Sequence, residues 1–169
     1  MKKLLLIILC IVFCLTFVSC GDPVITDGDV SETKQETGKT TFGLNEAASF
    51  KNLKFTALEF KESTGEDFFA PEEGNVFVGV KFSVENISNE EQSVSTLLMF
   101  EGYADDVKCD YSISAATVFS DGTLDGSIAA GKKLVGWYAL EVPENWSTIE
   151  LVIKPDLLSD KNVKFVYSK

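Results

Sequence analysis

The sequence contains no histidine and no arginine, so that all 15 of its basic side chains are lysines. Without histidine there is no imidazole to act as a general base, nucleophile or metal ligand. Without arginine there is no planar guanidinium to bind phosphate or carboxylate through paired hydrogen bonds. The remaining catalytic arrangements are a Ser–Lys pair, a carboxylate pair or a metal-bound water, and none has a recognisable spacing here. We therefore expect no enzymatic activity and no cofactor.

Cysteine is also scarce: three of the four cysteines lie within the first 20 residues. Cys109 lies in an alternating segment with Val107, Tyr111 and Ile113, so we expect an inward-facing, unreactive thiol. If the early cysteines leave with a leader or carry a lipid, Cys109 has no partner for an internal disulfide. The domain must then be stabilised by its own hydrophobic core.

Residues 1–19 have the features of a secretory signal peptide, with two lysines followed by an apolar run from residue 4 to residue 18. This run is shorter than the roughly 20 residues that a membrane-spanning helix needs. The sequence FVSC at residues 17–20 resembles the lipobox of bacterial lipoproteins. It predicts cleavage before Cys20 and lipidation of that residue, which would anchor the chain on the extracytoplasmic face of a bacterial membrane. Ordinary cleavage nearby, with a free Cys20, is the alternative.

Cleavage at this site would leave 13 lysines against 26 acidic residues, a net charge of −13. A surface of this charge repels nucleic acid, which we exclude as a partner. Residues 20–41 are rich in Gly, Thr, Asp and Glu, and too few of their side chains are apolar to form a core. We expect them to be a flexible tether that holds the domain on the order of 25 Å from the anchor.

From residue 42 to residue 169 the pattern is that of β-strands. The clearest strand is 75–86, where Val76, Val78, Val80, Phe82 and Val84 share one parity. The apolar parity changes within residues 50–60, which predicts a bulge near Ala57. No segment predicts a helix longer than a turn or two. Short alternating strands separated by turns predict an all-β, antiparallel, immunoglobulin-like sandwich of about seven or eight strands, with strands at 42–44, 50–60, 75–86, 94–100, 107–113, 134–142, 149–153 and 163–167.

Several segments resemble a known family. They are GNVFVGV at residues 74–80 leading into FSVEN at 82–86, AGKK at 130–133, and GWYALEVP at 136–143. Together they look like a bacterial lipoprotein family of unknown function, whose immunoglobulin-like domain is similar to the secreted mycobacterial immunoprotective antigen. The resemblance covers roughly residues 42–167 and implies a β-sandwich. The resemblance assigns no catalytic residue to this chain.

Three aromatic residues are candidates for a binding surface. Phe68 and Phe69 lie in a long acidic loop at residues 61–74, where they either fold back to close one end of the sandwich or form an exposed aromatic patch. Trp137 has the opposite parity to Leu134 and Tyr138, so it should face outward unless another segment covers it.

Asp121, Thr123, Asp125 and Gly126 match the opening positions of a calcium-binding loop, but Lys132 stands where such a loop has its bidentate glutamate. We therefore expect an ordinary turn and no metal site, with Asp121 and Asp125 as weak candidates for cation ligands and weak binding elsewhere among the acidic residues left open.

These observations predict a lipid-anchored extracytoplasmic module that binds a protein or another envelope component without catalysing a reaction. Immunoglobulin-like folds often serve in this way, which is an analogy of fold. The alternative is a lipoprotein that binds a cation or a small ligand through the acidic loops 61–74 and 121–126.

Overall fold

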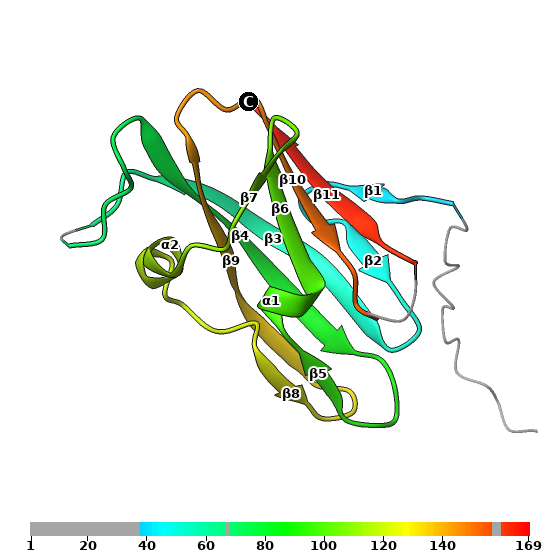
Figure 1. Ribbon diagram of the computed structural model, residues 1–169. Coiled ribbons are helices and arrows are strands. Elements are labelled where there is room, and N and C mark those ends of the chain that lie inside the picture. Colours follow the sequence, from blue (N-terminus) through cyan, green and yellow to red (C-terminus); the bar gives the residue numbers. More distant parts are fainter. Residues whose placement is uncertain (1–37, 67, 157–159) are drawn as a thin grey trace, which may run out of the picture. The chain divides into compact units, whose positions relative to one another are not determined.

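The computed structural model describes residues 38–66, 68–156 and 160–169 (Figure 1). The predicted signal peptide, the lipidation site at Cys20 and all but the last four residues of the predicted tether lie outside these residues. In the described part, no helix is long and apolar enough to cross a membrane.

The predicted strand at residues 75–86 is confirmed as β4 (Asn75–Asn86). Its five alternating apolar side chains are all at most 6% exposed, because they face the interior between two sheets. β4 pairs with β3 (Leu53–Ser63) on one side and with β9 (Lys133–Pro143) on the other, and β2 (Ala47–Ser49) extends the sheet beyond β3. The register of β3 against β4 shifts between Ala57 and Glu59, which confirms the predicted bulge.

The second sheet has five strands in the order β1 (Thr41–Phe42), β11 (Val163–Ser168), β10 (Thr148–Ile153), β6 (Phe100–Ala104) and β7 (Val107–Cys109). β1 runs parallel to β11, and the other pairs are antiparallel. A separate small hairpin joins β5 (Gln92–Val94) to β8 (Gly126–Ile128). The antiparallel β-sandwich is thus confirmed, and most of the strands beyond the predicted seven or eight are two or three residues long.

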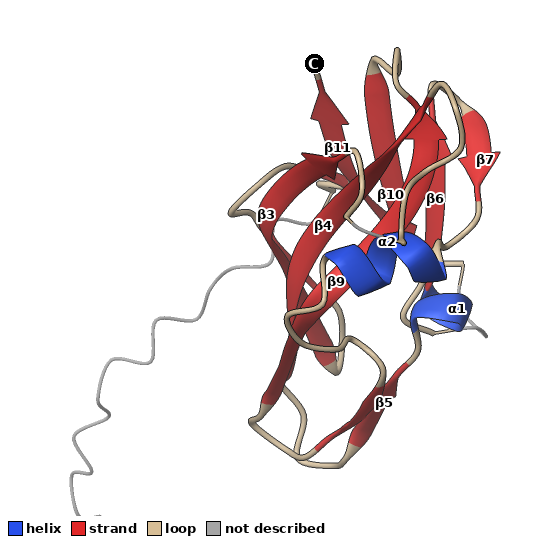
Figure 2. Ribbon diagram, turned by 90° about the vertical axis from the view of Figure 1, so that its left-hand side faces the viewer, coloured by secondary structure: helices blue, strands red, loops and turns tan. Residues whose placement is uncertain are grey.

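The two sheets lie against each other (Figure 2), and aromatic side chains join them across the interior. The ring of Phe82 on β4 meets those of Phe100 on β6 and Phe165 on β11 edge to face, at centroid distances of 5.5 and 5.1 Å. All three residues are at most 4% exposed. Such contacts add to the free energy of burying these large side chains, so they hold the sheets together without a disulfide.

The predicted strand at residues 94–100 is wrong in its middle. Residues 96–99 form a single helical turn, α1 (Thr96–Met99), and β6 begins at Phe100. The Asp125 carboxylate fixes this turn, because it accepts hydrogen bonds from the Thr96 amide at 2.7 Å and from the Thr96 hydroxyl at 2.8 Å. Leu97 and Leu98 are therefore 75% and 60% exposed instead of buried.

The predicted strand at residues 107–113 is also shorter than expected. β7 ends at Cys109, and the Ser112 hydroxyl caps a second short helix, α2 (Ile113–Val118), by accepting a hydrogen bond from the Ala115 amide at 3.1 Å. Cys109 packs against the core but stays half-buried. Val107 and Ile113, which the alternation placed inside, are 67% and 77% exposed.

Asn86 provides a test of the fold, because it is fully buried at the end of β4. Its amide donates to the carbonyls of Glu90 and Ile128 at 2.7 and 2.8 Å and accepts from the Ser88 amide at 2.9 Å. We expect Asn86→Ala to lower the free energy of unfolding by about 3 kcal/mol, since it leaves buried polar groups unpaired. Urea denaturation measures this. The exposed Asn89→Ala variant should change by less than about 0.5 kcal/mol, and an equal effect of both changes would contradict the assignment.

Candidate functional site

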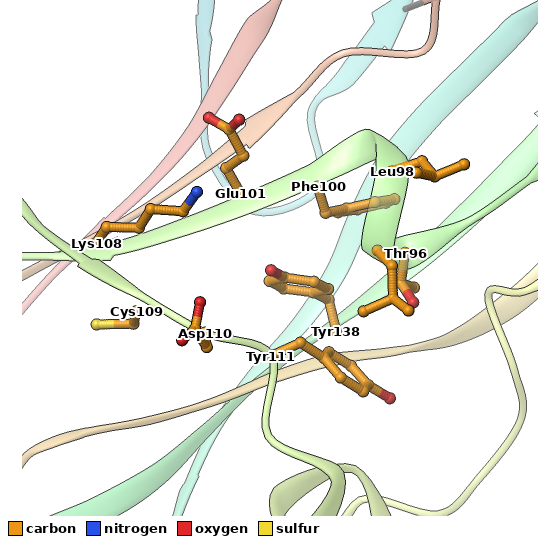
Figure 3. A pocket seen from close by; sticks show the side chains of 10 residues that line it. Thr96, Leu98, Phe100, Glu101, Lys108, Cys109, Asp110, Tyr111 and Tyr138 are labelled. Carbon is orange, nitrogen blue, oxygen red and sulfur yellow. The ribbon is translucent and has the colours of Figure 1, made fainter.

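A pocket lies between α1, β6, β7 and β9, and thus between strands of both sheets (Figure 3). Its volume is about 160 Å³. The aromatic floor consists of Phe100, Tyr111 and Tyr138, whose rings are in contact: Tyr138 stacks on Phe100 at 5.1 Å and meets Tyr111 at 5.5 Å. The exposed leucines 97 and 98 of α1 lie at its rim. The structure thus provides a small pocket with aromatic rings at its base and a largely polar lining.

Tyr138 is only 3% exposed, but no group among the described residues forms a hydrogen bond with its hydroxyl. Figure 3 shows this hydroxyl pointing into the space between Glu101, Lys108 and Asp110. Burial, and then the nearby charges of Asp110 and Glu101, raise the pKa of Tyr138, so the hydroxyl is protonated at neutral pH. This hydroxyl opens into the pocket and has no hydrogen-bond partner among the described residues, so it is available to a ligand.

The pocket residues were missed from the sequence. Strand alternation assigned Tyr138 to the core and placed Lys108 and Asp110 on a solvent-facing side, and each of those assignments is compatible with an ordinary sandwich. The one available signal was the polar tip of Tyr138 at a core position, since tyrosine brings a hydroxyl that must be satisfied. The sequence does not show that Lys108 and Asp110 lie beside Tyr138, because this depends on the path that the chain takes at and after β7.

Glu101 at the pocket mouth is engaged within the protein. Its carboxylate contacts the Lys154 ammonium at 3.0 Å and accepts a hydrogen bond from the Tyr103 hydroxyl at 3.2 Å. The bond from Lys154 lowers the pKa of Glu101, and partial burial opposes this effect. Glu101 therefore stays ionised with its charge matched by Lys154.

The loop between β3 and β4, of which the structure describes residues 64–66 and 68–74, is called the aromatic loop below, and it presents Phe68 to solvent. The Phe68 side chain is 98% exposed and that of Phe69 is 42% exposed. The interpretation in which these rings fold back to close one end of the sandwich is therefore wrong. Their exposure agrees with the other interpretation, an exposed aromatic patch. Figure 1 shows the loop projecting from the ends of β3 and β4. The reason lies in the backbone: Glu66 and Phe69 exchange hydrogen bonds of 2.9 and 2.8 Å, which fold the loop on itself.

Trp137 faces away from the core, as its parity predicted, but it is covered and only 6% exposed. The ring of Phe119, just after α2, stacks on it at 5.2 Å. The ammonium groups of Lys61 and Lys81 lie over its ring at 5.2 and 5.5 Å. Trp137 is thus part of a second, smaller core and is corrected from a candidate binding residue to a packing residue.

The two candidate cation ligands bind other parts of the protein. Asp121 pairs with the Lys81 ammonium at 2.7 Å, which lowers the pKa of Asp121, and Asp125 holds Thr96 at the start of α1. In the part of the chain that the structure describes, no three acidic or cysteine side chains gather into a metal-binding cluster. The two aspartates that resemble a calcium loop thus each make a contact within the protein.

Burial raises the pKa of the Cys109 thiol, which agrees with an unreactive cysteine.

Residues 42–163 match the model of a domain of unknown function, DUF4352. No curated protein is a significant match to the sequence. The match confirms the resemblance that the strand and turn segments indicated.

Several solved structures have a similar fold. A candidate lipoprotein of Bacillus subtilis, ycdA, matches with a TM-score of 0.60 and 17% identity over 72% of this chain, which spans only 38% of that protein. A β-sandwich protein of Clostridium difficile matches with a TM-score of 0.52 and 18% identity, covering 80% of this chain and 97% of that one. The secreted protein MPT63 of Mycobacterium tuberculosis matches with a TM-score of 0.52 and 11% identity, covering 79% and 99%. At these identities the comparisons establish the fold alone.

The covering of Trp137 leads to a fluorescence prediction. Phe119→Ala should expose the Trp137 ring, shift its emission to longer wavelength and lower the free energy of unfolding by about 3 kcal/mol, because a buried aromatic contact is lost. The measurement is best made in a Trp146→Phe background, which leaves a single tryptophan. Ile113→Ala, on the exposed side of α2, should leave the emission unchanged. An unshifted spectrum in the Phe119 variant would show that α2 does not cover Trp137.

The Glu101–Lys154 contact leads to a pH prediction. A carboxyl whose pKa is lowered on folding stabilises the protein above its ordinary value of 4.5, and this stabilisation is lost as the pH falls through the lowered value. Lys154→Met should therefore raise the pKa of Glu101. NMR of the Glu101 carboxyl carbon as a function of pH measures this pKa. The stability difference from the unchanged protein should shrink as the pH falls below the ordinary carboxyl value of 4.5, because Glu101 then becomes protonated in both proteins. Lys132→Met serves as the control and should leave the Glu101 titration unchanged.

Proposed function

The chain belongs to the DUF4352 family, and we propose that it is a non-catalytic binding module, anchored by a lipid on Cys20 at the extracytoplasmic face of a bacterial membrane. The FVSC sequence at residues 17–20 supports the anchor. A candidate lipoprotein and a secreted protein among the structural neighbours agree with this location. The absence of histidine and arginine from the sequence supports a binding role over a catalytic one.

The observation that carries the proposal is the exposure of Phe68. A phenylalanine that is 98% exposed gains nothing from burial in the free protein, but it offers a large apolar surface to a partner. Backbone hydrogen bonds between Glu66 and Phe69 hold the loop in shape, so less conformational entropy is lost on binding. Aromatic side chains presented in this way often dominate the free energy of an interface.

The charge around Phe68 favours a protein over the membrane surface as the partner. Glu66, Glu72 and Glu73 of the same loop are all exposed. Their carboxylates are repelled by the anionic lipids of a bilayer surface, but they complement lysines and arginines around an apolar pocket. We infer that the partner is an envelope protein with a basic rim around a pocket that accepts the phenyl ring.

Photocrosslinking tests this proposal in the membrane-anchored full chain. A photoreactive phenylalanine at position 68 should form one discrete protein adduct, whereas the same residue at position 87, where Ile87 is 44% exposed on another loop, should not. Raising the salt concentration should weaken adduct formation, because screening reduces attraction between acidic and basic surfaces. Adducts only with lipid, or the same adducts from both positions, would contradict the proposal.

The matched alanine variants separate binding from folding. Phe68→Ala should leave the free energy of unfolding within about 0.5 kcal/mol, because the ring makes few contacts in the free protein. It should weaken capture of the crosslinked protein by tenfold or more, as expected for loss of a central aromatic contact worth about 2 kcal/mol. Ile87→Ala should weaken it little. Turnover of a substrate abolished by one serine or acid substitution would contradict the non-catalytic role.

A further inference from the structure

The pocket beside α1 has a size that suits a small organic molecule with both polar and apolar parts. Its volume is about 160 Å³, it is open to solvent on one side, and its lining is largely polar. The aromatic rings of Phe100, Tyr111 and Tyr138 form the floor, and Leu98 lies at the rim (Figure 3). Such a site can hold one short aliphatic or aromatic group.

Three polar groups at this pocket lack a partner in the part of the chain that the structure describes. The first is the hydroxyl of Tyr138, which points into the pocket. The other two are the side chains of Lys108 and Asp110, for which no ion pair or hydrogen bond is present. Lys108 lies on β7, and Asp110 follows directly after this strand. Because alternate residues of an extended segment share a face, both side chains reach the pocket (Figure 3).

The charges at the pocket are balanced, and this decides the class of ligand. Glu101 is paired with Lys154 at 3.0 Å, and the nearby charge of Lys108 adds to the lowering of the Glu101 pKa. Lys108 and Asp110 are then the charged residues of the pocket lining that form no ion pair of their own. A simple cation would be repelled by Lys108, and a simple anion by Asp110. A molecule that carries both charges can satisfy both side chains at once.

We propose that this pocket binds a small zwitterion with an apolar group, the chemistry of a free apolar amino acid. The ligand's ammonium donates to the Asp110 carboxylate and to the Tyr138 hydroxyl oxygen, which can accept while its proton remains. The ligand's carboxylate accepts from the Lys108 ammonium. The apolar group lies against the ring of Tyr111 and the exposed side chain of Leu98. This site shares no residue with the aromatic loop, so it is a function beyond the partner binding proposed above.

A set of four related probes tests each part of this recognition in the full chain. Leucine carries all three features, glycine lacks the apolar group, 3-methylbutylamine lacks the carboxylate, and 4-methylpentanoate lacks the ammonium. NMR titration should show leucine binding at least tenfold more tightly than each of the other three, with amide shifts centred on residues 108–111. Equal affinity for leucine and the amine, or for leucine and the carboxylate, would overturn the zwitterion assignment.

Single substitutions assign the three polar contacts. Tyr138→Phe, Asp110→Asn and Lys108→Met should each weaken leucine binding about tenfold, the effect of losing one charge-assisted or buried hydrogen bond. Asp106→Asn is the matched control: it removes the same charge from the β6–β7 turn, where φ is 69° and asparagine is well tolerated, and should change affinity less than twofold.

The outcomes separate this proposal from misfolding and from the role of the loop. Lys108 and Asp110 are exposed, so their variants should keep the melting temperature of the unchanged protein even if Tyr138→Phe does not. Unaltered leucine affinity in both of these variants, or leucine shifts away from residues 108–111, would overturn the site. Crosslinking from position 68 reports on the aromatic loop alone, so its failure leaves the pocket assignment intact.

Discussion

The burial of β4 on both of its faces is the constraint on which the rest of this structure depends. One face lies between the two sheets, with Phe82 fully buried, and the other carries Phe77, also fully buried, beneath the segment that contains α2. A strand that is buried on both sides needs cover on both sides, and the second cover comes from residues 110–125, which would otherwise be a simple connection. The position of α2, the enclosure of Trp137 and the shape of the pocket wall all follow from this need.

The acidic side chains divide into those that build the fold and those that remain free. Asp125 fixes α1, and Asp105 accepts hydrogen bonds from the Ser147 and Thr148 amides at 3.0 and 2.8 Å. Glu62 accepts from the Trp146 indole at 2.7 Å. Such contacts explain how a chain of net charge −11 can fold without disulfides: many of its carboxylates take part in local hydrogen bonds. The charge that remains at the aromatic loop and at Asp110 is what a partner or ligand can use.

Strand alternation predicted much of the sandwich, because the parity of apolar residues reflects burial directly, as in β4 and β9 and at the bulge near Ala57. The errors have a different origin. The turn at α1 depends on Asp125, 29 residues away from Thr96, and the enclosure of Trp137 depends on Phe119, whose contacts no local pattern shows. The exposure of Phe68 depends on a backbone pairing within its own loop. The anchor at Cys20 remains a prediction from the sequence.

The pocket is built before any ligand arrives, which bears on what it can bind. Thr96 is held by Asp125, and the segment at Tyr111 is fixed to β9, where the Ser112 amide donates to the Ala139 carbonyl at 2.9 Å. Tyr138 is stacked on Phe100. Of the groups that a ligand would meet, the exposed Lys108 is the one with most freedom to lose, at up to about 2 kcal/mol. The aromatic rings at the base of the pocket and the Tyr138 hydroxyl are already in place. Little binding free energy is therefore spent on ordering the protein, and a ligand with few atoms can bind.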